Sequence, residues 1–176
     1  MEKVKLRGAT LIMVISIILI IFGAFSLLGG VASSFMGRLT ASTLRLDDFA
    51  LQYYQTVGMI SLISGAVELI CGIFGVRLRN NQDKAGTLLT VGIIYVIVTV
   101  FTTLYTNMLA AAGERVIAQI IEATGVMTDS TGINVNSLAS SSNIVSMVIG
   151  FALPALFIVG ALLNRLPPKN QYPHNA

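Results

Sequence analysis

The chain has little charge, one cysteine, no tryptophan and a single histidine. Of its 176 residues, 55% are hydrophobic and 11% are charged, whereas soluble domains carry about 25% charged residues. Long charge-free runs cause this deficit, so a soluble globular domain is not the expected class. Because Cys71 has no partner cysteine in the chain, no intramolecular disulfide orders the segments outside the membrane. We interpret Cys71 as a small packing residue.

Catalytic sequences are missing as well. The chain contains no H-E-x-x-H, no G-x-S-x-G and no Walker sequence. The lone histidine, His174, lies near the end of the chain, and the spacing of Asp129, Asn134 and Asn136 does not fit a calcium-binding loop. We therefore expect no enzyme, no catalytic residue, no metal site and no cofactor. The net charge of +3 reflects membrane topology, so we predict no nucleic-acid partner.

Four apolar segments are long enough to cross a bilayer, which takes roughly 20 residues of helix. Helices are expected because backbone groups in lipid must be satisfied within the segment. The first segment exceeds the apolar region of a cleaved signal peptide, about 7–15 residues, so we expect it to be retained. The sequence predicts an all-α integral membrane protein that forms one four-helix transmembrane domain over 1–176. Its predicted spans are 9–31, 57–76, 85–108 and 144–163.

Lysine and arginine concentrate on one side of the predicted spans. Eight of the 11 basic residues fall on the side that holds both ends of the chain, and three fall on the other side. Basic residues collect in the cytoplasmic segments of membrane proteins, so we expect a multi-pass cell-membrane protein with both termini in the cytoplasm. The eight are Lys3, Lys5, Arg7, Arg77, Arg79, Lys84, Arg165 and Lys169.

The segments between the spans differ in size. We predict outer loops at 32–56 and 109–143, a tight cytoplasmic turn at 77–84, and a disordered tail at 166–176. Asp47 and Asp48 favour a helix start at that point, because an acidic side chain caps and stabilises a helix N-terminus.

The second outer loop is the larger one, and its first part continues the helical pattern. Val116, Ile117, Ile120 and Ile121 form an apolar stripe opposite charged residues, which predicts an amphipathic helix outside the membrane. That helix would lie on the membrane surface or pack on the first outer loop. The Ser-, Asn- and Gly-rich stretch 124–143 predicts irregular structure.

One carboxylate, Glu68, lies near the middle of the second span. A charge at the bilayer centre costs about 2.5–3.5 kcal/mol on insertion scales, and no span contains a Lys or Arg to neutralise it, so we expect Glu68 to be protonated. Tyr95 falls at about the same depth in the third span, and Thr99 follows it one turn later. We predict an intramembrane polar site of Glu68, Tyr95 and Thr99, with Glu68 and Tyr95 close together. This site either binds helices to one another or binds a proton, a cation or a partner helix.

Small residues form stripes on two spans. Gly58, Gly65 and Gly72 recur every seven residues, and Gly75 shares their face of the helix. Gly23 belongs to a similar stripe on the first span. Small residues allow close approach of membrane helices, so these five glycines are predicted packing positions, within the chain or against another copy. Proline interrupts helices, and we predict a kink at Pro154.

Together these features favour a non-enzymatic membrane protein that acts through protein–protein interactions of its outer loops and small-residue helix faces, as an assembly, scaffold or regulatory subunit. Its partners would be the lipid bilayer and a membrane or extracytoplasmic protein, or further copies of the chain. The alternative is an oligomeric transporter or channel subunit that uses Glu68 as a proton or cation site. A third possibility is lipid binding by the predicted helix at 114–123.

Overall fold

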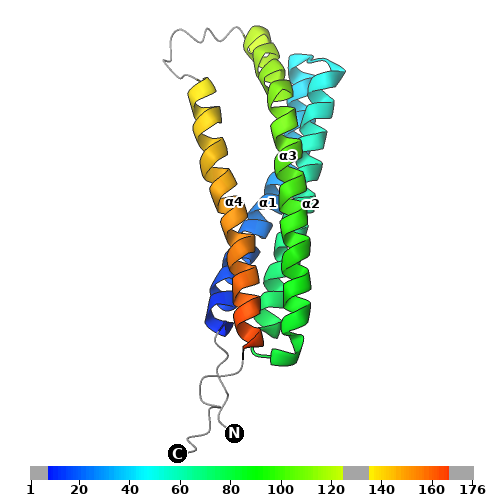
Figure 1. Cartoon of the computed structure of the whole chain (residues 1–176). Coiled ribbons are helices and arrows are strands. Elements are labelled where there is room, and N and C mark those ends of the chain that lie inside the picture. The colour runs from blue at the N-terminus through cyan, green and yellow to red at the C-terminus, as the bar shows by residue number, and fades with distance from the viewer. Residues whose placement is uncertain (1–7, 125–134, 167–176) are drawn as a thin grey trace, which may run out of the picture.

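The protein is a set of long helices in a computed structural model that describes residues 8–124 and 135–166. For Ala111 and residues 135–149 it describes the backbone alone. No strand occurs in these described ranges. The elements in chain order are α1 (Ala9–Leu44), α2 (Asp48–Leu78), the short 3-10 helix η1 (Gln82–Lys84), α3 (Ala85–Thr124) and α4 (Val135–Arg165) (Figure 1).

Three stretches are long and apolar enough to cross a membrane: Ala9–Leu44, Asp48–Leu78 and Gln82–Ala110. In α4 the apolar stretch that the structure describes with its side chains, Gly150–Arg165, is shorter. The predicted all-α class is therefore confirmed for the described residues, and three helices could span a bilayer by their length and composition.

The first connection differs from the prediction. Residues 32–44 continue α1 instead of forming a loop, and only Arg45–Asp47 separate α1 from α2. Nothing in 32–44 stops a helix, since this stretch contains no proline and the Ser34 hydroxyl donates to the carbonyl of Gly30 at 3.0 Å. Arg45 ends α1 with a positive φ of 52°. The oxygen Oδ1 of Asp47 then accepts from Ala50 N at 3.0 Å, so α2 begins where the sequence predicted.

The second connection also contains more helix than predicted. The amphipathic segment after Met108 is the last part of α3, which runs unbroken to Thr124. Of its apolar stripe, Val116 is 1% exposed and Ile117 is 41% exposed, and Gln119 donates to Asp47 at 2.8 Å. Residues 135–143, predicted to be irregular, are the start of α4. Residues 125–134 and 167–176, predicted as irregular loop and disordered tail, lie outside the described residues.

The two ends of the bundle differ. One end carries Arg77, Arg79, Lys84 and Arg165, and we call it the basic end; the other, with the α1–α2 turn and the last turns of α3, is the far end. α1 and α2 lie side by side as an antiparallel pair. α4 approaches the other helices at the basic end and separates from them toward the far end (Figure 1).

The hydrophobic core lies in the half of the bundle next to the basic end. Large buried side chains from all four helices meet there, and Phe157 of α4 is fully buried among them. The core residues are Ile12, Ile15, Leu19, Cys71, Leu88, Tyr95, Phe157 and Ala161. On α1 and α2 beyond this core, burial falls mainly on glycine and alanine.

Candidate functional site

Glu68 lies on α2, one turn beyond the core residue Cys71, and its side chain is half-buried. Two hydroxyls hold its carboxylate. Ser26 of α1 donates to Oε2 at 3.3 Å, and Ser64 of α2, one turn away along the same helix, donates to Oε1 at 3.5 Å. The carboxylate therefore bridges α1 and α2, with one hydroxyl supplied by each helix.

The glycine stripes bring Ser26 to Glu68. A side chain at Gly23 would place its Cβ 2.8 Å from the carbonyl oxygen of Gly65, and one at Gly65 would meet the carbonyl of Gly23 at 2.8 Å. Gly30 and Gly58 face each other one heptad farther along, at 2.8 and 2.9 Å. These are backbone contacts that only glycine permits. Because the seven-residue repeat occurs on both helices, it fixes one antiparallel register, which we call the α1–α2 seam.

The glycines predicted as packing positions all lie against other parts of the same chain. Gly72 faces Ser16 and Ile20 of α1, and Gly75 packs against Ser16 and against Phe157 of α4. Ser16 itself is fully buried, and its hydroxyl has no hydrogen-bond partner. These glycine faces are thus occupied within the chain.

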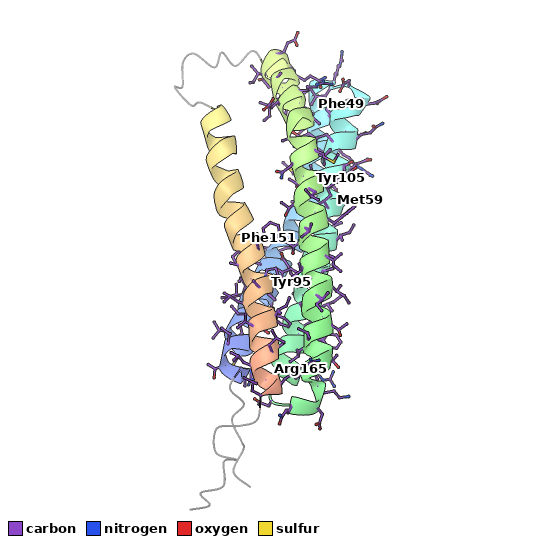
Figure 2. The ribbon with its side chains drawn as sticks, viewed as in Figure 1. Phe49, Met59, Tyr95, Tyr105, Phe151 and Arg165 are labelled. Atoms are coloured by element: carbon purple, nitrogen blue, oxygen red, sulfur yellow. The ribbon has the colours of Figure 1, made fainter. Side chains whose placement is uncertain are left out.

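Tyr95 and Thr99 are buried residues of α3. Tyr95 is 3% exposed and belongs to the core, where it lies on the side of α3 that faces α4 (Figure 2). Thr99 is also buried, and its methyl carbon lies 3.9 Å from the position a Cβ at Gly150 of α4 would take. The hydrogen bonds of the described residues include none between Glu68 and Tyr95. The structure thus groups Glu68 with Ser26 and Ser64, and Tyr95 with the core.

The threonines that follow on α3 bond to their own helix. Thr102 donates to the carbonyls of Val98 and Thr99 at 2.9 and 3.1 Å, and Thr106 donates to the carbonyl of Thr102 at 2.8 Å. Such bonds within one helix do not require a partner helix. The hydroxyl oxygens still have lone pairs that accept hydrogen bonds from water.

Two polar contacts lie at the basic end. Asn164 of α4 is fully buried and donates from Nδ2 to the carbonyl of Arg79 at 2.8 Å, while its Oδ1 has no partner. This bond satisfies a carbonyl at the C-terminus of α2, where helices leave carbonyls unpaired. The thiol of Cys71 lies 3.8 Å from the carbonyl of Val91 on α3. Pro154 is a buried residue inside α4, and the kink predicted there stays a prediction.

Sequence reasoning missed Ser26 and Asn164 as partners. The sequence did contain a signal for Ser26. When the glycine repeats of α1 and α2 are aligned in antiparallel, residue 26 lies beside residues 62 and 65, and residue 65 is one turn from Glu68. No comparable repeat occurs on α4, so Asn164 had no such signal.

The chemistry of this arrangement is limited. Within the ranges described, no group of three or more His, Cys, Asp or Glu side chains could hold a metal ion. A single carboxyl group with two hydroxyls can bind a proton or act as a hydrogen-bonded bridge between helices. Comparison with protein-family models, curated proteins and solved structures returned no match.

Proposed function

We propose that all four helices cross the bilayer, that the basic end faces the cytoplasm, and that the protein binds another protein at its far end without catalysing a reaction. The fourth crossing rests on the apolar run 144–163, which has the length of a spanning helix. The orientation rests on the excess of Lys and Arg at the basic end.

The supporting observation is the length of the helices. α1 has 36 residues and α3 has 40, which correspond to about 54 and 60 Å at about 1.5 Å per residue. The hydrocarbon core is about 30 Å thick. Measured from the basic end, about the last 24 Å of α1 and about the last 30 Å of α3 stand outside the hydrocarbon on the outer side.

The outer parts of the helices are fastened to each other. Tyr53 and Tyr54 of α2 pack against Gly113 of α3 and Gly37 of α1, with the two rings 5.8 Å apart at 71°. Asp47 receives a hydrogen bond from Gln119 of α3 at 2.8 Å. These contacts tie three helices into one extramembrane projection, which we call the stalk, and a rigid stalk suits the presentation of a binding surface.

The stalk carries an exposed apolar strip on α1. Val31, Phe35, Met36 and Leu39 are 59%, 62%, 58% and 46% exposed. They continue the face of α1 that holds Phe25, so exposed apolar residues run from Met13 to Leu39, about 39 Å. On α3 exposed apolar residues run from Ile93 to Met108, about 22 Å, and Ile117 is exposed farther along the helix.

This strip exceeds what the hydrocarbon core covers, and an exposed apolar patch outside the membrane is typical of a protein-binding surface. The charged residues on this part of α1 and in the turn that follows are Arg38, Arg45 and Asp47, so charges of both signs lie near the strip. The fitting partner is therefore a protein segment with an apolar face.

Site-specific photocrosslinking in cells tests this proposal. A photoreactive residue at Phe35 should give a protein adduct, whereas the same residue at Phe25, 69% exposed on the same face but within the hydrocarbon, should react with lipid. Adducts containing only this chain identify the partner as a second copy. If position 35 reacted only with lipid, the strip would be membrane-embedded and the proposed binding function would be wrong.

A second function is favoured by the half-buried carboxylate of Glu68 between two hydroxyls. We propose that the Glu68 carboxylate is a proton or cation site of an oligomeric transporter or channel subunit. In reconstituted liposomes, Glu68→Gln should abolish flux, while Glu114→Gln, an exposed carboxylate on α3, should leave it unchanged. Equal flux in wild type and Glu68→Gln would remove Glu68 from any transport role.

A further inference from the structure

We propose that Glu68 is a protonation site reached by water from the far end of the bundle and closed to water from the basic end. This inference rests on the second proposed function and adds the direction from which protons arrive. It follows from where the packed core ends, which kinds of residue lie on either side of Glu68, and which groups face it.

The route toward the basic end is blocked by large side chains. One turn in that direction along α2 lies Cys71, 2% exposed, and beside it lie Leu19 of α1 and Tyr95 of α3, 0% and 3% exposed. Phe157 of α4 fills the next layer against Gly75 and Gly92. Protein interiors packed in this way leave few voids larger than a water molecule, and an apolar void of that kind stays dry.

The direction toward the far end has a different lining. Ser61 and Ser64 share the face of α2 that carries Glu68, and neither is fully buried. On α3, Thr102 is half-buried and Thr106 is exposed. Hydroxyls supply the donors and acceptors that water needs at a polar site.

The charges around Glu68 make the proton its simplest ligand. The groups facing it are the hydroxyls of Ser26 and Ser64, with the thiol of Cys71 and the phenol of Tyr95 on the core side. No Lys, Arg, Asp or Glu occurs in Gly8–Gly37, in Ala85–Gly113 or in Val135–Asn164. Without a cation to balance it, an ionised carboxylate at this depth is costly, and binding a proton removes that cost.

Cysteine labelling from each side of sealed vesicles tests the direction of access. In full-length protein carrying Cys71→Ser, the variants Glu68→Cys and Ser64→Cys receive a membrane-impermeant thiol reagent in right-side-out and in inside-out vesicles. Ser42→Cys and Asn80→Cys, both at exposed positions, report the far end and the basic end. Leu19→Cys reports the core.

We expect positions 64 and 68 to react at least tenfold faster in the vesicle orientation in which position 42 reacts, and position 19 to react in neither. Faster reaction in the orientation in which position 80 reacts, equal rates from both sides, or no reaction at either position overturns the inference. Because Ser64→Cys keeps the carboxylate, it reports access even where Glu68→Cys fails to fold.

A hydrophobic carbodiimide, which reacts with protonated carboxyl groups, tests protonation in the unmodified chain. Its labelling of Glu68 should fall when the pH is raised on the far-end side and should not change when the pH is raised on the basic-end side. The opposite dependence, or labelling insensitive to pH on both sides, overturns the inference.

These outcomes are separable from those of the flux experiment. Far-side access combined with flux that is unchanged in Glu68→Gln retains this inference and removes the transport function. Access from the basic end combined with flux lost in Glu68→Gln retains the transport function and removes this inference.

Discussion

The two halves of the bundle are built differently, and Glu68 lies at their boundary. In the basic half, large side chains of α1, α3 and α4 pack together with Cys71 of α2 around Phe157 and Tyr95. In the far half, the buried residues of α1 and α2 are glycines and alanines of the seam, and α4 stands apart. The basic half therefore supplies most of the apolar burial that stabilises the fold, while the far half leaves polar and apolar surfaces available for binding.

The largest expected effect comes from breaking the seam that joins the halves. In Gly65→Leu, the new Cβ would lie 2.8 Å from both the carbonyl oxygen of Gly23 and the amide of Leu27. Overpacking costs about 1–3 kcal/mol where side chains shift, and we expect more here because the obstacle is backbone. Thermal unfolding in detergent, followed by circular dichroism, should show a large loss of stability.

The matched control for that substitution is Gly29→Leu on α1. A Cβ at Gly29 meets nothing within 4 Å, so this variant should unfold at or slightly above the wild-type temperature, since glycine is a poor helix former. Equal stability of the Gly65 and Gly29 variants would show that α1 and α2 do not pack through glycine.

The next effect tests the basic half alone. Asn164→Ala removes the donor that satisfies the Arg79 carbonyl at 2.8 Å, and loss of a hydrogen bond of this kind costs about 0.5–1.5 kcal/mol. Asn107→Ala, at an exposed position on α3, is the control and should have little effect. If both variants unfolded at the same temperature as the wild type, the Asn164 side chain would not hold α4 to α2.

The sequence allowed the all-α class and the packing role of the glycines to be predicted, because charge-free runs and a seven-residue glycine repeat are local patterns. Whether the glycines pack within the chain or against another copy stayed open, and the pairing of α1 with α2 is seen only in the structure. The sequence allowed the start of α2 to be predicted from Asp47 and Asp48, but not the end of α1 or the end of α3. Residues 32–44 contain serine and glycine, which favour a loop when considered alone. In the structure Gly37 packs under Tyr54, a contact between residues far apart in the chain that keeps this stretch helical.

The candidate site was predicted in part for the same reason. The position of Glu68 in a span follows from composition, but its partner depends on helix orientation. Depth alone paired it with Tyr95, because 1.5 Å per residue places both at one level. In the structure Tyr95 is buried in the core with Phe157 and Leu19, and the described residues show no hydrogen bond between Tyr95 and Glu68, so the approach of these two side chains stays a prediction.

A smaller effect is expected at the far end of the stalk. Asp47→Ala removes both the cap of α2 and the bond from Gln119, and loss of a helix N-cap typically costs about 1 kcal/mol. Gln119→Ala removes the bond and keeps the cap, so it should cost less. Hydrogen exchange should rise in the first turn of α2 for Asp47→Ala only, and in the last turns of α3 for both. Increased exchange throughout the core would mean that the two halves unfold as one unit.

The smallest effect is expected for Ser26→Ala, which removes one of the two hydroxyls on Glu68. Hydrogen bonds between membrane helices average about 0.6 kcal/mol, whereas a hydrogen bond to a charged group contributes about 1.5–3 kcal/mol. The measured change therefore reports the charge of Glu68: about 0.6 kcal/mol is expected for a protonated carboxyl, and 1.5 kcal/mol or more would contradict protonation. Repeating the substitution in Glu68→Leu should abolish the effect, while Ser42→Ala, whose hydroxyl bonds only its own helix, should show no change. A residual loss in the Glu68→Leu background would mean that Ser26 stabilises the seam by packing and that its hydroxyl does not depend on the carboxyl group.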